Sequence, residues 1–115
     1  MMPHGFFYAG LTFLILHEMD AVRCREWRIF PGLSALPDRL GFQLFMLAHI
    51  PLLVLLLRAL PAVGAPRLVF WLDVFFIVHV GLHLLFLRHP RNEFRDLLSW
   101  SLIIGAGVFG VLDLL

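Results

Sequence analysis

Two histidines, His79 and His83, stand four residues apart in a nearly continuous apolar stretch. On a helix this spacing places both imidazoles on one face, so one metal ion can bind both without movement of the backbone. His17 and Asp20, three residues apart, share a face of a second apolar stretch, and His49 lies in a third. Imidazoles joined by one carboxylate form a ligand set that zinc favours. We therefore predict a zinc site whose three or four protein ligands come from His17, Asp20, His49, His79 and His83.

Glu18 is a candidate for chemistry beside this metal. On a helix its side chain points about 100° away from that of His17, so it is not required as a ligand. Zinc lowers the pKa of a bound water to about 7, and a neighbouring carboxylate can accept the proton of that water. Glu18 is therefore the predicted catalytic base of a metal-dependent hydrolase. Iron in a di-metal centre is an alternative, although such centres normally use more carboxylates than this set supplies.

The composition of the 115 residues indicates a membrane protein. Hydrophobic residues make up 61% of the chain and charged residues 15%, against about half and a quarter in soluble domains. Four apolar stretches, at residues 6–22, 40–60, 67–88 and 97–115, each have the length that a helix needs to cross a bilayer. The prediction is an all-α, polytopic membrane protein. Residues 1–115 form a single domain, an antiparallel four-helix transmembrane bundle, with an interfacial segment at 23–39.

Estimated depths bring the histidines together. At about 1.5 Å per residue from the arginine-rich helix ends, His17 lies about 9 Å deep and His49 about 14 Å deep. His79 and His83 lie about 14 and 8 Å deep by the same measure. An ionised side chain at mid-membrane costs at least about 2.5 kcal/mol, so a shared layer of such groups calls for an explanation. Asp73 lies in the other half of the membrane and is not expected to join them.

Arginine counts predict the orientation. The first and third connections hold seven arginines and the second holds two, which places the first and third in the cytoplasm of a bacterial-type inner membrane. Both termini are then periplasmic, and the site opens toward the cytoplasmic interface, where a lipid or amide substrate could reach it. The net charge of +1 gives no field that would attract nucleic acid.

Small residues and capping residues give further expectations about how the helices pack and where they begin. Gly105, Gly107 and Gly110 lie in the last apolar stretch, where small residues allow another helix to approach closely, either in this chain or in a homo-oligomer. Asp38 is a candidate cap for the helix at 40–60, and Asn92 for the helix at 97–115.

Two other functions fit the same residues. The polar layer could hold the helices together in a non-enzymatic scaffold, a transporter element or a partner subunit, because histidines in membrane helices often hydrogen-bond between helices. The chain could also be a haem-binding electron carrier, with His49 and His79 as axial ligands at matching depth. Detection of bound metal would favour the hydrolase over the scaffold, and a Soret band would identify haem.

Three segments carry a resemblance to known families: LTFLILHEMDAVRCREWRIFPGL, AHIP and HVGLHLLFLRHPRNEF. They resemble an uncharacterised family of short bacterial four-helix membrane proteins. The run from His17 to Asp20 is also similar to the motif of the HXXEE family of proposed membrane metal proteins, with Asp20 and Ala21 where that motif has two glutamates. The HxxxH of His79 and His83 is locally similar to one in the ceramidase and adiponectin-receptor superfamily. These resemblances imply a metal site without implying a reaction.

Overall fold

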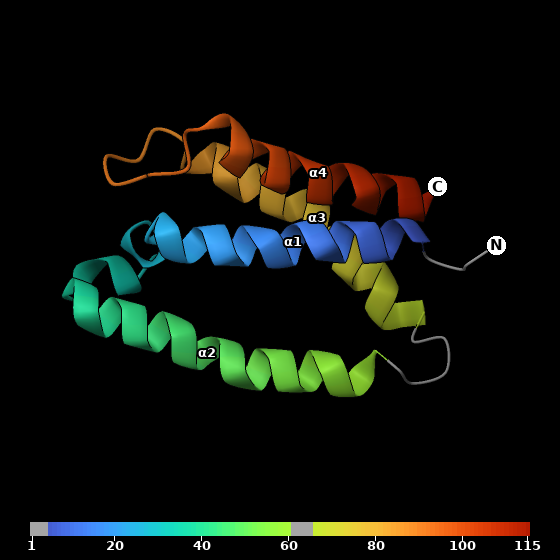
Figure 1. The fold of residues 1–115 in the computed structure, drawn as a ribbon, viewed down its shortest axis with the longest axis horizontal. Coiled ribbons are helices and arrows are strands. Elements are labelled where there is room, and N and C mark those ends of the chain that lie inside the picture. Colours follow the sequence, from blue (N-terminus) through green and yellow to red (C-terminus); the bar gives the residue numbers. More distant parts are fainter. Residues whose placement is uncertain (1–4, 61–65) are drawn as a thin grey trace.

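The computed structural model describes residues 5–60 and 66–115, and within them all regular secondary structure is helical. Four long helices follow one another, α1 (Gly5–Arg23), α2 (Asp38–Ala59), α3 (Pro66–Leu85) and α4 (Leu97–Leu114) (Figure 1). Two short 3₁₀ turns, η1 (Glu26–Arg28) and η2 (Leu33–Ala35), lie between α1 and α2. The prediction of an all-α protein is confirmed for the described residues.

The third helix ends at Leu85, three residues before the predicted end at Arg88. The hydrogen bonds there shorten from the α to the 3₁₀ pattern, because Leu87 N donates to Leu84 O and His89 N donates to Phe86 O. Pro90 follows directly, and a proline disfavours the helical conformation of the residue before it. The chain therefore turns out of the helix one turn before the proline.

Three of the helices form a packed core, and α2 stands beside it. In Figure 1, α1 runs alongside α4 over most of its length and α3 crosses behind α1 to pack on α4, whereas α2 lies apart and meets the others at the end that carries η1 and η2. Phe7 from α1, Phe76 from α3 and Ala106 from α4 are completely buried in this core. By contrast, long apolar side chains of α2 such as Leu55 and Leu57 are mostly exposed.

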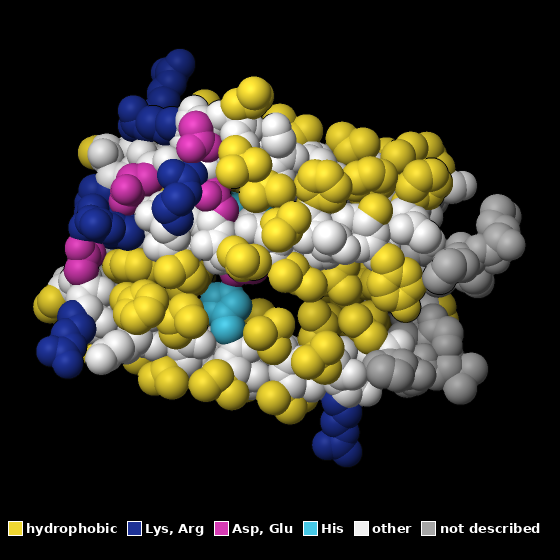
Figure 2. Space-filling model, in the orientation of Figure 1, with side chains coloured by type: hydrophobic (Ala, Val, Ile, Leu, Met, Phe, Trp, Pro, Cys, Tyr) yellow, Lys and Arg dark blue, Asp and Glu magenta, His cyan; other side chains and the backbone are white. Residues whose placement is uncertain are grey.

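The exposed apolar surface indicates a membrane environment. Three helices, α2, α3 and α4, are long and apolar enough to cross a membrane. Figure 2 shows a broad hydrophobic band over the molecule and a gathering of arginine and acidic side chains at one end. Exposing this much hydrocarbon to water would cost about 25 cal/mol per Å², a cost that a bilayer removes. The first helix, which carries His17, Glu18 and Asp20, is not among the three.

At the charged end of the molecule, Asp38 at the start of α2 contacts residues of the α1–α2 and α3–α4 connections. Its carboxylate accepts hydrogen bonds from Arg28 and from Trp27 Nε1, the latter at 3.2 Å, and lies 3.7 Å from Arg91. Pro37, not Asp38, occupies the N-cap position of α2, so the expected cap is wrong. The aspartate instead fixes η1 and the loop after α3 over the end of the core.

Asp96, not the expected Asn92, caps α4. Its Oδ1 accepts a hydrogen bond of 2.8 Å from the backbone N–H of Ser99. This bond lowers the pKa of the Asp96 carboxyl, and a negative charge at a helix N-terminus also interacts favourably with the helix dipole. Asn92 holds the loop instead, since its Oδ1 accepts from Phe94 N and its Nδ2 donates to Leu87 O, each at 3.1 Å.

The glycines of α4 permit close packing within this chain. A Cβ at Gly110 would lie 2.8 Å from the carbonyl oxygen of Asp73 in α3, and one at Gly105 would lie 2.7 Å from the ring of Phe13 in α1. Each glycine therefore allows a helix of the same chain to approach α4 closely, and a homo-oligomer is not needed to explain it.

Replacing Gly110 with alanine is expected to destabilise the protein by about 1–3 kcal/mol, because the added methyl meets rigid backbone. Gly81→Ala is the matched control, since a Cβ there would have nothing within 4 Å. Thermal unfolding in detergent measures both. Equal melting temperatures for the two variants would contradict the close contact between α3 and α4.

Candidate metal centre

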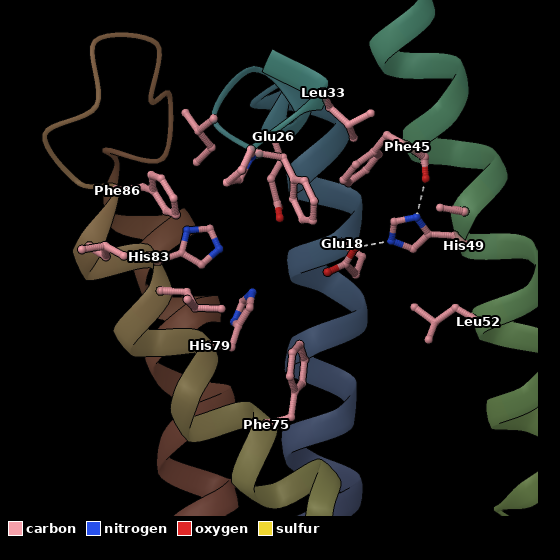
Figure 3. A pocket seen from close by; sticks show the side chains of 16 residues that line it. Glu18, Glu26, Leu33, Phe45, His49, Leu52, Phe75, His79, His83 and Phe86 are labelled. Carbon is pink, nitrogen blue, oxygen red and sulfur yellow. Dashed lines mark hydrogen bonds and ion pairs between the residues drawn. The ribbon is translucent and has the colours of Figure 1, made fainter. Parts of the chain in front are cut away.

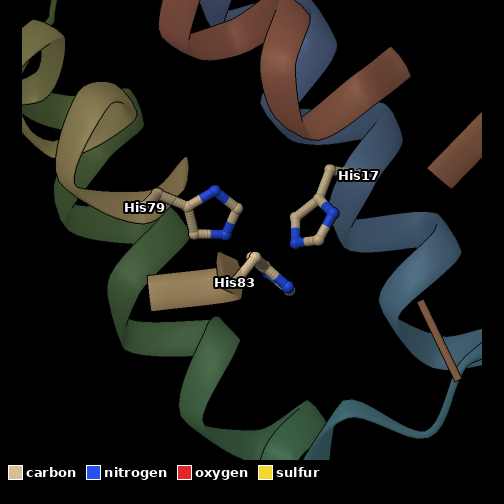
Figure 4. Close-up of side chains that lie close together, drawn as sticks. All are labelled: His17, His79 and His83. Carbon is tan, nitrogen blue, oxygen red and sulfur yellow. The ribbon is translucent and has the colours of Figure 1, made fainter. Parts of the chain in front are cut away.

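Three histidines from two helices meet inside the core. The ring centroids of His17 and His79 are 4.5 Å apart, those of His17 and His83 4.8 Å, and those of His79 and His83 4.6 Å. Each residue offers one ring nitrogen that lies within 4.8 Å of the other two. Figure 4 shows the three side chains, one from α1 and two from α3, directed toward a common point. We call His17, His79 and His83 the three-histidine cluster.

Helix geometry and aromatic packing position this cluster. The spacing of His79 and His83 places both on the face of α3 that meets α1, where His17 is completely buried. Phe94, from the loop before α4, packs on two of the rings, with centroids 5.3 Å from His17 and 4.7 Å from His83. Phe75 covers His79 from the other side at 5.6 Å. The imidazoles therefore lie in a largely apolar enclosure.

The buried nitrogens of this enclosure lack hydrogen-bond partners. Within the described residues, Nδ1 and Nε2 of both His17 and His79 are buried and make no hydrogen bond. A buried polar atom without a partner costs about 1–3 kcal/mol. A bound cation would accept one lone pair from each imidazole and so satisfy one nitrogen of each ring. Tetrahedral zinc with bonds of about 2.0–2.1 Å spaces its nitrogens by about 3.3 Å, so the ligand atoms need only a modest approach.

Glu26 joins the cluster from outside the long helices. Its Oε2 lies 3.5 Å from Nε2 of His17 and is itself buried without a hydrogen bond among the described residues. The left-handed backbone of Arg25, with φ of 52°, reverses the chain after α1 and directs η1 back over the core. Sequence reasoning missed this residue. The available signal was that Glu26 is the only acid between Arg23 and Pro37.

Glu18 and His49 form a pair between α1 and α2. Nε2 of His49 lies 2.6 Å from Oε2 of Glu18, and its Nδ1 lies 2.7 Å from the carbonyl oxygen of Phe45 (Figure 3). Because a carbonyl only accepts, Nδ1 carries a proton, and the bond to Glu18 holds a second one. Glu18 also lies with His17 and Glu26 in a group whose ligand atoms are within 4.8 Å. His49 thus orients Glu18 and does not reach the three-histidine cluster.

A cavity of about 630 Å³ opens between α2 and the core. Its polar lining consists of Glu18, Glu26, His49, His79 and His83, and the rest of its lining is apolar. Figure 3 shows Glu18, His49 and His83 at about one level, with His79 displaced toward Leu52 and Phe75 and Glu26 displaced toward Leu33 and Phe86. The cluster is therefore reachable from a large apolar space.

Asp20 lies in a different network from the one predicted for it. Its carboxylate accepts hydrogen bonds from Arg23 Nε at 2.7 Å and from the Ser99 hydroxyl of α4, and it contacts the Cys24 thiol. Burial raises the pKa of Cys24 to about 11, so the thiol stays protonated near neutral pH. The structure brings together three of the five predicted ligands and separates Asp20 and His49 from them.

Asp20→Asn is expected to leave metal content unchanged and to lower the thermal stability. Asparagine keeps the shape but not the charge that Arg23 and Ser99 bind, and hydrogen bonds to charged groups contribute about 1.5–3 kcal/mol. Elemental analysis and melting of the purified variant measure the two effects. A folded Asp20→Asn protein without metal would instead make Asp20 a ligand.

The chain was also compared with known proteins. The model of a family of unknown function (DUF6713) matches residues 4–115. The chain belongs to this family. Comparison with the curated proteins and with the solved structures gave no match. Membership agrees with the expectation of an uncharacterised family, and function has to be inferred from the site itself.

Proposed function

We propose that this protein is a zinc-binding integral membrane protein that hydrolyses a lipid or amide substrate at the membrane interface. The observation that supports the proposal most is the three-histidine cluster, in which buried ring nitrogens converge and make no hydrogen bond to any described residue. Three imidazoles are a ligand set of catalytic zinc, which keeps its fourth position for water.

Two carboxylates flank this position and have distinct roles in the proposal. Glu18, oriented by His49 at 2.6 Å, would be the general base that takes a proton from a water whose pKa a zinc ion held by the three histidines would lower. The water oxygen adds to the carbonyl carbon of the substrate, the carbon–oxygen or carbon–nitrogen bond breaks, and the proton passes from Glu18 to the leaving oxygen or nitrogen. The products are a carboxylic acid and an alcohol or amine. Glu26 offsets the positive charge of the ion.

The topology belongs to the same proposal. All four helices cross the membrane as an antiparallel bundle, with the arginine-rich end in the cytoplasm of a bacterial inner membrane and both termini in the periplasm. The gathering of charge at one end in Figure 2 supports this orientation. For α1, burial of His17 and Asp20 inside the protein supports a crossing, since these side chains do not face lipid. The likeness of the segment from His17 to Asp20 to the HXXEE motif fits a membrane metal protein.

Metal analysis of the protein purified in detergent tests the proposal. The expected result is about one zinc ion per chain, removal by a chelator with a fall in melting temperature, and recovery of both on addition of zinc, because binding free energy adds to the stability of the folded state. Substoichiometric metal that a chelator does not affect would overturn the proposal and leave a scaffold with a structural polar layer. A Soret band would overturn it in favour of haem.

A further inference from the structure

We infer that the cavity between α2 and the core binds the hydrocarbon chain of a membrane amphiphile, so that the hydrolysed bond is an ester or amide at the head of a long-chain lipid. The statement that an ester or amide bond is hydrolysed rests on the proposed function. The statement that a hydrocarbon chain is bound rests on the cavity alone. Together they name the class of substrate, which the three-histidine cluster by itself does not.

The lining of the cavity matches the two parts of such a molecule. On one side of the Glu18–His49 pair, Leu52 and Phe75 offer only hydrocarbon. The pair itself faces His79 and His83 across the cavity (Figure 3). A chain that lies against the apolar side brings a carbonyl group at its end between the proposed base and the proposed metal. The head group then points toward η1, η2 and the arginine-rich end.

The cavity is open to the part of the surface that faces lipid. In Figure 2, a hollow interrupts the hydrophobic band beside an exposed histidine side chain. Leu52 lines the cavity and is nevertheless 58% exposed. Water would find few hydrogen-bond partners along this apolar wall. A hydrocarbon chain from the bilayer needs no hydrogen-bond partner and can enter sideways through the hollow beside α2.

The size of the cavity suits a small molecule. Its volume of about 630 Å³ falls in the range of about 300–1,000 Å³ that small-molecule sites occupy. The hydrocarbon chain of a single lipid is an occupant of this kind.

Photo-crosslinking in vesicles tests the inference. The probe is a phospholipid with a photoreactive diazirine in one acyl chain, and the labelled residues are identified by mass spectrometry. Labelling is expected to concentrate on Leu52 and Phe75 over Leu55, which is exposed on α2 but does not line the cavity. Leu52→Trp should abolish labelling of Phe75, whereas the matched control Leu55→Trp should leave it intact. Both leucines are exposed, so neither variant loses a buried contact.

Zinc content measured on the same samples separates the two proposals. Labelling spread evenly over the lipid-facing residues overturns the inference, whether or not zinc is bound. Labelling concentrated in the cavity of a protein without zinc supports chain binding and overturns the hydrolase. If Leu52→Trp fails to fold, competition on the wild-type protein decides: an excess of unlabelled long-chain amphiphile must suppress the labelling of Phe75, and a short-chain analogue must not.

Discussion

His83→Ala is expected to remove the bound metal and to lower the melting temperature. The substitution leaves two imidazoles and takes away the chelate that His79 and His83 form on one face of α3. At a metal concentration of about 100 to 1,000 times the dissociation constant, loss of binding removes about 2.7–4.1 kcal/mol of stability. Elemental analysis and thermal unfolding, each with and without added zinc, measure the two effects.

Asp73→Asn is the matched control for His83→Ala. Asp73 is a buried polar residue of the same helix, about 9 Å along the axis from His79, so its substitution disturbs the core without touching the cluster. It should retain the full metal content. Equal metal content in the wild-type protein and His83→Ala would show that the cluster does not hold the ion.

Glu18→Gln is expected to lower the rate of hydrolysis by about 10²–10⁴-fold while zinc stays bound, which is the usual contribution of a general base. Glutamine is close in shape to Glu18 and can still hydrogen-bond to His49, but it cannot accept the proton of the water. Release of fatty acid from long-chain esters and amides in mixed micelles is the assay.

Glu93→Gln is the control for this experiment, because Glu93 is an exposed acid that contacts Arg28 at 3.6 Å and lies outside the cavity lining. Its rate should match that of the wild-type protein. A Glu18→Gln variant that keeps its zinc and its full rate would exclude Glu18 as the base and shift the role to Glu26.

The sequence identified the helices and the histidines, because both depend on local patterns. Apolar runs of the right length predict helices, and the spacing of His79 and His83 predicts that they share a face. Asp20 was assigned to the same site by the same reasoning from spacing. The stripe on α1 faces two neighbours, however, and one turn after His17 it meets α4 at Ser99 and not α3. Spacing on one helix cannot reveal which neighbour each turn contacts.

Glu26 and the position of His49 could not be predicted, for a different physical reason. Glu26 reaches the cluster through the left-handed turn at Arg25, a conformation that arginine rarely adopts and that no motif signals. His49 lies at a depth that suits the cluster, but α2 stands away from the core, so the side chain meets Glu18 across the cavity. The depth of a residue along its helix gives the height of its side chain in the membrane. Tertiary packing decides which other side chains it contacts.

The division of the three-histidine cluster between α1 and α3 has a consequence for biosynthesis. His17 leaves the ribosome 62 residues before His79, a delay of about 3–12 s at about 5–20 residues per second. During that interval the nascent chain offers no three-imidazole site, and an ion that encounters α1 alone finds a single histidine. If the cluster binds metal as proposed, binding would follow insertion of α3, and bound metal would then indicate that the first and third helices have been assembled correctly.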